Sequence, residues 1–329
     1  MKKAIIIGIT GQDGSYLARL LLDKGYHVVG ITRDALDHKD ANLRYLGIGP
    51  EIEMIELSVL NQDKILRILK KVKPAEVYNL SAQSSVGYSF IDPFSTLDYN
   101  VHSVLYWLEA IKIYDQGIKF YHASSSEMFG NVRETDLPLK ESLIFRPASP
   151  YGISKAAAHW LVVNCRETNE IFCSCGILFN HESPLRGENY VVKKVINTAV
   201  KIKMGLTAGP LKLGNVFIKR DWGFAPDYVQ AMWLIMQHKE PSDFLICSGN
   251  VWSLNDLVSY SFSLQDLDVD EYVVYDKSLL RSKDLDMIYG DNSKAKDSLG
   301  WEYNLTNELL IDKLFEEEFK FVEWELQNA

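Results

Sequence analysis

The chain has 329 residues, of which 47% are hydrophobic and 24% are charged, a composition typical of a globular protein with one large core or two ordinary domains. The formal net charge of −9 argues against a nucleic-acid partner, because nucleic-acid-binding proteins usually present a basic face. No stretch approaches the roughly 20 apolar residues of a membrane span, nor the apolar region of a signal peptide, so we expect no membrane partner and a cytoplasmic protein.

Apolar runs alternate with amphipathic stretches through the first half of the chain. The strands expected from apolar runs cover 3–9, 27–32, 75–81, 118–125 and 172–179. The helices expected from apolar periodicity cover 15–25, 61–73, 94–114 and 149–168. Because strands that alternate with helices form parallel sheets through right-handed crossovers, we predict an α/β fold with a Rossmann-type doubly wound sheet.

After about residue 183 the pattern loosens, and glycine, proline and polar loops become frequent. Helices are still expected over 225–238 and 307–326. We therefore predict a dinucleotide-binding domain over 1–183, to which some later segments return, and a smaller mixed α/β domain over 184–329. Ligands of such sheets bind at the carboxyl ends of the strands, so the segments after each strand are the candidate sites.

Three glycines, Gly8, Gly11 and Gly14, separate the first expected strand from the first expected helix. Their spacing is not the G-x-G-x-x-G of the dinucleotide fingerprint, but a turn between a strand and a helix is the context that fingerprint requires. Glycine lets the backbone approach a pyrophosphate, and the helix N-terminus supplies free N–H groups and positive potential. The alternative is a flexible turn without a ligand.

The second expected strand ends at Thr32 and is followed by Arg33 and Asp34. An arginine here suits the 2′-phosphate of NADP, whereas an acidic residue suits the 2′-hydroxyl of NAD. We favour NADP as the cofactor and leave NAD open. A solvated turn without a ligand is the third interpretation.

Four polar residues follow the later strands in patterns that suit catalysis. Ser125 and Glu127 are two apart on an extended segment, which points both side chains the same way. Tyr151 and Lys155 are four apart at a helix start and share one face. A neighbouring ammonium and a nicotinamide cation would lower the pKa of a phenol that is otherwise a poor base. Each pair alone is common by chance on protein surfaces.

Four cysteines are present, Cys165, Cys173, Cys175 and Cys247. Cys173 and Cys175 form a C-x-C pair inside an apolar run, without a second Cys or His pair at metal-binding spacing. We expect buried free thiols, no metal site and a reducing compartment.

Five stretches in order resemble the GDP-mannose 4,6-dehydratase family of the extended short-chain dehydrogenase/reductase superfamily. They are "GITGQDGSYLA", "SSSEMFG", "SPYGISK", "GILFNHESPLRG" and "LGNVFIKRDWGFAPDYVQAMW". The resemblance runs from residue 3 to about residue 320. It implies a hydro-lyase with tightly bound NADP(H) that forms a 4-keto-6-deoxy GDP-sugar, and a homodimer or homotetramer.

The resemblance also implies the role of each catalytic residue. Tyr151 is the base at the sugar 4-hydroxyl, with Lys155 beside it. Ser125 stands where the family usually has threonine and donates a hydrogen bond to the 4-oxygen. Glu127 is the acid and base for water loss.

The remaining site residues divide between the cofactor and the GDP-sugar. Those assigned to the cofactor, together with Tyr151 and Lys155, are Gly8, Thr10, Gly11, Gln12, Asp13, Arg33, Ser58, Leu80, Ser81, Ala82, Ser84, His181 and Arg186. Those assigned to the substrate are Ser85, Asn180, Lys194, Gly214, Asn215, Arg220, Arg281 and Asp284. Lys194, Gly214 and Asn215 border the guanine in this assignment, and Arg220 pairs with the diphosphate.

Two departures from the family weaken the NADP assignment. The loop after the second strand reads "RDALDHKDANLR", where the family usually has paired arginines and serines. Ser58 replaces an aspartate that would meet the adenine.

Several alternatives stay open. The substrate could be a GDP-heptose or a GDP-N-acetylhexosamine, or the enzyme could be a 4-reductase that does not need Glu127. A non-catalytic NADP-binding sensor is the alternative outside enzymology. The helix over about 95–114 and the helix after Tyr151 are expected to pack against a second copy, although Leu105, Trp107, Trp160 and Leu161 could equally be core.

Overall fold

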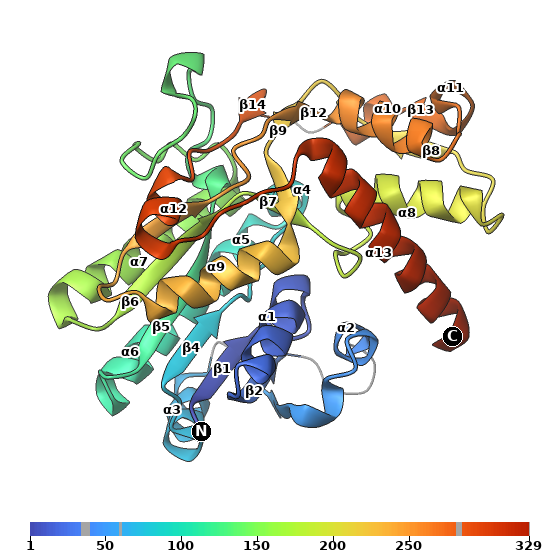
Figure 1. Cartoon of the computed structure of the whole chain (residues 1–329). Coiled ribbons are helices and arrows are strands. Elements are labelled where there is room, and N and C mark those ends of the chain that lie inside the picture. The colour runs from blue at the N-terminus through green and yellow to red at the C-terminus, as the bar shows by residue number, and fades with distance from the viewer. Residues whose placement is uncertain (34–39, 59–60, 281–284, 329) are drawn as a thin grey trace.

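The computed structural model describes residues 1–33, 40–58, 61–280 and 285–328 (Figure 1). The strands of the largest sheet are β1 (Lys3–Ile7), β2 (His27–Thr32), β3 (Glu53–Glu56), β4 (Glu76–Asn79), β5 (Lys119–Ser125), β6 (Cys173–Leu178) and β11 (Asp243–Ile246). The strands of the smaller sheets are β7 (Asn180–Glu182), β8 (Leu211–Leu213), β9 (Lys219–Arg220), β10 (Trp222–Phe224), β12 (Trp252–Ser253), β13 (Val273–Tyr275) and β14 (Met287–Ile288).

Helices occur throughout the described chain. They are α1 (Gln12–Asp23), α2 (Ala41–Tyr45), α3 (Gln62–Val72), α4 (Val86–Ile91), α5 (Pro93–Leu97), α6 (Ser103–Tyr114), α7 (Pro150–Asn169), α8 (Val191–Lys203), α9 (Ala225–Gln237), α10 (Leu254–Leu264), α11 (Val269–Tyr272), α12 (Ser293–Leu299) and α13 (Asn307–Asn328). Of the described helices, none combines the length and the apolar character that crossing a bilayer requires.

The largest sheet has seven parallel strands in the order β11-β6-β5-β4-β1-β2-β3. The chain runs outward from β1 through β2 to β3 and then returns to the other side of β1 with β4. This reversal is the topological switch point at which ligands of doubly wound sheets bind. The predicted Rossmann-type fold is confirmed.

The residues of β1 explain why helices cover both faces of the sheet. Ala4 and Ile6 pack with α1 and α9 on one face, whereas Ile5 and Ile7 pack with α3, α6 and α7 on the other. Side chains alternate between the two faces of a strand, so an all-apolar strand needs cover on both sides. Figure 1 shows α1 and α9 in front of the sheet.

Two strands of the largest sheet, β3 and β11, were not predicted from the sequence, and neither were the short strands of the smaller sheets. β3 reads E-M-I-E and is the half-exposed edge of the sheet, so its apolar run is only two residues long. β11 is fully apolar over its last three residues, but it lies in the second half of the chain and joins the sheet from there. The division of the chain at residue 183 stays a prediction, with α9 and β11 as returning segments.

The long helix predicted over 94–114 is present, but its middle turn is wider than that of an α-helix. The structure has α5, then a π-helical turn over Asp98–His102, then α6. Asn100 in the π turn accepts a hydrogen bond from the Gln83 amide at 2.8 Å and donates to Ser154 Oγ at 2.9 Å. The widened turn thereby directs the Asn100 side chain toward the segment after β4. Such π-helical turns often occur near functional sites.

The second half of the chain builds its own apolar core between α8, α10 and α13. Lys193 of α8 and Glu318 of α13 form a buried ion pair inside it. The far end of α13 reaches α2, where the ring centre of Tyr45 lies 4.9 Å from that of Phe321 and 5.5 Å from that of Trp324. α13 therefore connects this second core to the first half of the chain (Figure 1).

The four cysteines are buried free thiols, as predicted. Asp243 lies beside Cys175 and His159, but its carboxylate accepts two hydrogen bonds from Arg166, at 2.9 and 2.7 Å. This bidentate pair ties α7 to the edge strand β11.

Candidate active site

Two adjoining cavities open at the carboxyl ends of β1, β2, β4 and β5. The register of the sheet explains their position, because Ile7 lies level with Ile31 and with Asn79, so the segments that follow leave at one edge. The glycine-loop cavity is lined by Gly8, Thr10, Gly11, Gln12, Arg33 and Ser81, among others. The Tyr151 cavity is lined by Ser85, Ser125, Glu127, Tyr151, Lys155, Asn180, His181 and Arg220, among others. Both linings include Asp13, Leu80, Ala82, Ser84, Arg186 and Tyr190.

Two glycines of the first cavity, Gly8 and Gly14, occupy places that disfavour any side chain. Gly8 has a φ of +86°, and a Cβ on Gly14 would lie 2.2 Å from the Gly8 carbonyl oxygen. Gly11 is the N-cap of α1, and no side chain among the described residues caps it. The amides of the first helical turn therefore remain available to an anion at this cavity. A pyrophosphate fits this cradle.

Arg33 marks the far end of the glycine-loop cavity. Its guanidinium carbon lies 4.7 Å from the centre of the Tyr99 ring, and both residues line the cavity. Asn42 of α2 also lines it and donates to the carbonyl oxygens of Thr10 and Leu185, at 3.1 and 3.4 Å. Asp34, the competing acidic residue, lies outside the described residues.

Asp13 and His181, both predicted cofactor contacts, bind each other. His181 Nε2 lies 2.9 Å from each Asp13 oxygen, and Nδ1 donates to the Phe179 carbonyl oxygen at 2.7 Å. Burial alone would raise the pKa of Asp13, but the charge of His181 and its hydrogen bond outweigh burial and lower that pKa to about 2. The imidazole thus lies between the Phe179 carbonyl oxygen and the Asp13 carboxylate, and it links β7 to the glycine loop.

Gln12 completes the same junction. Its Nε2 donates to the His181 carbonyl oxygen at 3.1 Å, and its Oε1 accepts from Ser183 Oγ at 2.7 Å. These contacts attach the glycine loop to β7. His181 of β7 lies 168 residues after Asp13 in the chain. The side chains of Gln12 and Asp13 hold the two halves of the chain together at the cavity.

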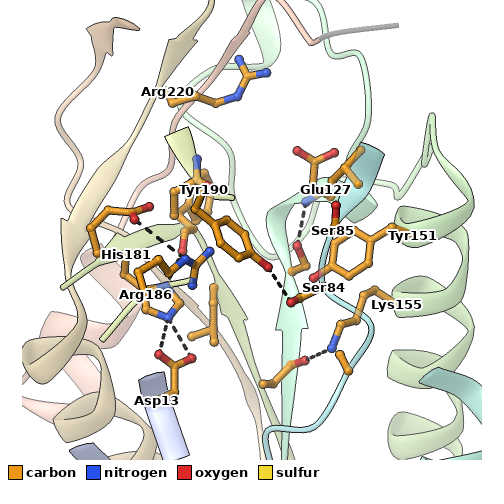
Figure 2. Close-up of a pocket in the computed structure, with 18 of the residues that line it drawn as sticks. Asp13, Ser84, Ser85, Glu127, Tyr151, Lys155, His181, Arg186, Tyr190 and Arg220 are labelled. Carbon is orange, nitrogen blue, oxygen red and sulfur yellow. Dashed lines mark hydrogen bonds and ion pairs between the residues drawn. The ribbon is translucent and has the colours of Figure 1, made fainter. Parts of the chain in front are cut away.

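The predicted catalytic residues come from the end of β5, the turn after it and the start of α7. Ser149 caps α7 by accepting a hydrogen bond from the Gly152 amide at 3.0 Å, and Pro150 occupies the first turn. A Cβ on Gly152 would lie 2.7 Å from the Glu127 carbonyl oxygen, so the helix start packs directly against the turn that carries Glu127. Ser125, Glu127, Tyr151 and Lys155 thereby line one cavity (Figure 2).

Lys155 and Tyr151 are both buried. Lys155 Nζ donates to the Ala123 carbonyl oxygen at 2.9 Å, and burial lowers its pKa to about 8. Burial raises the pKa of Tyr151, and a hydrogen bond with Ser125 opposes the rise. We expected Lys155 to lower the pKa of Tyr151, but its Nζ lies 5.9 Å from the ring centre and burial dominates.

Three of the predicted substrate residues, Ser85, Asn180 and Arg220, line the Tyr151 cavity. Arg220 is buried at the end of β9, which gives this acidic protein a local positive charge. Arg186 lies with its Nε 3.8 Å from Glu182 Oε2 and its guanidinium carbon 3.9 Å from the Tyr190 ring centre.

The other predicted residues lie elsewhere. The described linings of the two cavities do not include Ser58, Lys194, Gly214 or Asn215. Lys194 Nζ donates to the Lys212 carbonyl oxygen at 2.7 Å, and Asn215 accepts from the Phe217 amide at 3.0 Å. Arg281 and Asp284 fall outside the described residues. These six assignments stay predictions.

Sequence reasoning missed several lining residues. They are Glu182, Asn189, Tyr190, Ile218 and Trp222 of the Tyr151 cavity, and Asn42 and Tyr99 of the glycine-loop cavity. Tyr190 and Asn189 follow the "NHESPLRG" stretch directly, so extending that motif by three residues would have included them.

Known proteins resemble this chain over nearly its whole length. The family described as "GDP-mannose 4,6 dehydratase" matches residues 5–314. "GDP-mannose 4,6 dehydratase 1" of Arabidopsis thaliana is 40% identical over 334 residues, which cover 98% of this chain and 91% of that protein.

Two solved structures with low sequence identity share the fold. The structure of RMD from Pseudomonas aeruginosa complexed with NADPH has a TM-score of 0.81 at 22% identity, with 97% of this chain and 99% of that chain covered. The dTDP-glucose 4,6-dehydratase of Bacillus anthracis in complex with NAD has a TM-score of 0.85 at 19% identity, with 98% of each chain covered. The family match spans both cavities and the catalytic residues, and the chain belongs to the GDP-mannose 4,6-dehydratase family, within the extended short-chain dehydrogenase/reductase superfamily.

Proposed function

We propose that the protein is a GDP-sugar 4,6-dehydratase, a hydro-lyase that converts a GDP-mannose-like substrate into a 4-keto-6-deoxy GDP-sugar. The observation that carries the proposal is the shared cavity of Ser125, Glu127, Tyr151 and Lys155, which adjoins the glycine-loop cavity. The family match supports the same chemistry.

The residues present fit a nicotinamide dinucleotide. The glycine loop and the start of α1 would hold the pyrophosphate, and Lys155 would hold the nicotinamide ribose. When bound, the nicotinamide would supply the hydride chemistry, which moves a hydride from C4 of the sugar to C6. We propose NADP because Arg33 and Tyr99 at the end of the glycine-loop cavity suit a 2′-phosphate.

The side chains of the Tyr151 cavity handle the protons. Tyr151 takes the proton of the 4-hydroxyl, while Ser125 donates a hydrogen bond to the same oxygen. The 4-ketone then acidifies the proton on C5, which Glu127 removes and delivers to the departing C6 hydroxyl, so that one water leaves and a C5=C6 double bond remains. Return of the hydride to C6 is completed by a proton at C5, which balances the proton that Tyr151 took from the 4-hydroxyl. General acid and base steps of this kind accelerate reactions by roughly 10²–10⁴-fold each.

Arg220 is our candidate for the diphosphate of the GDP-sugar. Its burial at the Tyr151 cavity favours a charge-assisted contact with an anion. Ser85 and Asn180 would contact the sugar-phosphate portion from two other segments. GDP-mannose is the substrate we propose, and a GDP-heptose or a GDP-N-acetylhexosamine is the alternative for the same chemistry.

One assay tests the proposed reaction. The purified protein, incubated with GDP-mannose and without added NADPH, should form a product that has lost one water and carries a 4-ketone. The Glu127→Gln variant should bind NADPH normally and form at least 100-fold less product, because the acid and base for water loss is gone. A 4-reductase would instead leave GDP-mannose unchanged and would consume added NADPH stoichiometrically only when a 4-keto-6-deoxy GDP-sugar is supplied.

The position of Glu127 favours a dehydratase over a 4-reductase. It lies in the Tyr151 cavity, where a reductase does not need it. Tyr151 and Lys155 line the same cavity, which speaks against a sensor without catalysis.

We also propose that the protein is a homo-oligomer that forms through α4, α5 and α7. Large apolar side chains are exposed along these three helices: Tyr88, Phe90, Ile91, Phe94, Leu97, Ile153 and Trp160. Apolar patches of this kind mark interaction surfaces. Two of the side chains that could be either interface or core can now be separated. Trp107 is fully buried in the core, whereas Trp160 is 58% exposed and belongs to the proposed interface. The buried free cysteines suit a cytoplasmic location.

A further inference from the structure

Tyr190 stands where the two cavities meet. It is the residue before α8, and its ring belongs to the linings of both the glycine-loop cavity and the Tyr151 cavity. Its hydroxyl lies 2.6 Å from Ser84 Oγ, which follows β4 and lines both cavities as well. Figure 2 shows the Tyr190 side chain extending between Arg186 and Ser84, with this hydrogen bond across the cleft.

The Tyr190 side chain is positioned by its neighbours. The Arg186 guanidinium packs over the ring at 3.9 Å, and the Tyr190 amide donates to the Gly187 carbonyl oxygen at 3.0 Å. Glu182 lies 3.8 Å from Arg186 and favours that position of the guanidinium by charge. The ring is thus held by contacts on its own side of the cleft, while only its hydroxyl reaches the other side.

A bound dinucleotide has to pass this point. Its pyrophosphate belongs at the glycine loop and its reactive end belongs beside Tyr151 and Lys155, which line different cavities. The middle of the molecule must therefore cross the stretch that both linings share, where Ser84 and Tyr190 are joined. A single hydrogen bond there can open to admit the dinucleotide and close again.

We propose that the Tyr190–Ser84 hydrogen bond is a latch that retains the nicotinamide cofactor during turnover. The inference rests on the proposed function, in which the same cofactor molecule must stay bound between the removal of a hydride from C4 and its delivery to C6. Loss of the reduced cofactor between these steps would strand a ketone intermediate in the site. A residue that slows release therefore protects the reaction cycle without contacting the sugar.

The latch predicts how fast NADPH leaves. An intramolecular hydrogen bond contributes a factor of about two to ten. We expect Tyr190→Phe and Ser84→Ala each to release NADPH about two- to tenfold faster than the wild-type protein. The double variant should release it no faster than the faster single variant, because both substitutions remove the same bond.

The experiment loads each protein with NADPH, mixes it with excess NADP⁺ in a stopped-flow instrument and follows the loss of bound-nicotinamide fluorescence. Tyr260→Phe is the matched control, since its hydroxyl donates to Asp312 at 3.0 Å on another part of the molecule, and it should release NADPH at the wild-type rate. Equal release rates for wild type and Tyr190→Phe, or additive effects of the two substitutions, would overturn the latch.

The outcome is independent of the dehydratase assay. A protein that binds NADPH but forms no 4-keto product from any GDP-sugar contradicts the proposed function, and the release rates still decide whether the latch exists. A wild-type protein that does not bind NADPH overturns both.

Discussion

The buried charge of Lys155 has a proposed role in catalysis, but it lowers the stability of the folded chain. Its ammonium is buried beside the Ala123 carbonyl oxygen, and burial lowers its pKa to about 8. At neutral pH the group is still charged, and in the proposed function it would donate to a ribose hydroxyl of the cofactor. Keeping that charge away from water costs folding free energy.

The cost predicts a pH dependence. The pKa of Lys155 is lower in the folded chain than in the unfolded chain. Burial of its ammonium therefore lowers the free energy of unfolding by the full amount below about pH 8, and this loss disappears as the pH rises toward 10.5. Lys155→Met should therefore stabilise the protein more at pH 7 than at pH 10, by up to about 3 kcal/mol. Denaturant unfolding at both pH values measures the difference.

The matched control for this comparison is Lys70→Met, at an exposed position of α3. Its effect should be the same at pH 7 and pH 10 within about 0.5 kcal/mol. An equal effect of Lys155→Met at the two pH values would show that the ammonium is not buried at a cost.

Tyr151 gives the second prediction at the residue scale. Tyr151→Phe removes the phenol that would accept the proton of the 4-hydroxyl, and it leaves the ring in place. Formation of the 4-keto product should fall by at least 100-fold, while NADPH binding, measured by fluorescence titration, should change by less than about threefold. Unchanged turnover would exclude Tyr151 as the base.

At the scale of elements, local signals explain what the sequence predicted. β1 was found because three consecutive isoleucines are buried on both faces, and α7 was found because a cap, a proline and apolar periodicity coincide at its start. Tyr151 and Lys155 came with α7, since residues four apart share a helix face. The start of α1 was predicted from its glycines, because Gly8 has a positive φ and Gly14 lies too close to the backbone for a side chain.

The missed features lack such local signals. β3 is a half-exposed edge strand with a glutamate at each end. The π turn around Asn100 depends on contacts with Gln83 and Ser154, far away in the chain. Tyr190 meets Ser84 across 106 residues, so no spacing in the sequence encodes their contact. Tertiary packing decides all three cases.

At the scale of elements, we predict that a side chain at Gly14 disturbs the packing of α1 against β1. In Gly14→Ala the new methyl group would lie 2.2 Å from the Gly8 carbonyl oxygen, so α1 would have to move away from β1. We expect a loss of about 1–3 kcal/mol in unfolding free energy and at least tenfold weaker NADPH binding. Urea unfolding and fluorescence titration measure the two effects.

Gly49→Ala is the control, because a Cβ there would meet no described atom within 4 Å. It should leave both quantities near their wild-type values. Wild-type NADPH affinity in Gly14→Ala would contradict the role of the glycine loop as the pyrophosphate cradle.

At the scale of the whole molecule, the two halves of the chain meet at the cavities. The Asp13–His181 ion pair, the Gln12 hydrogen bonds and the Tyr190–Ser84 bond all join the first half to the second. The exposed apolar side chains of α4, α5 and α7 form a separate surface, which we assign to a second copy of the chain. In this assignment α4 and α7 would serve both ligand binding and assembly, since Val86, Tyr151 and Lys155 of these helices line the Tyr151 cavity while other residues of the same helices are exposed.

The assembly surface can be tested by charge. Phe94 is 85% exposed on α5 and Trp160 is 58% exposed on α7. The wild-type protein should sediment as a dimer or tetramer, and Phe94→Glu with Trp160→Glu should dissociate it, because desolvating two carboxylates is costly. Leu326→Glu on α13 is the control at another exposed apolar residue and should not change sedimentation. A monomeric wild-type protein would reject the assignment.

The contact of α13 with α2 has a consequence for folding. Tyr45 of α2 packs on Phe321 and Trp324, while Asn42 of the same helix lines the glycine-loop cavity. The wall of that cavity is therefore supported by α13, a helix far along the chain from the glycine loop. Contacts between distant parts of a chain form slowly, because the chain must first lose the entropy of closing a long loop. We therefore expect the glycine-loop cavity to take its final shape only after α13 has packed on α2.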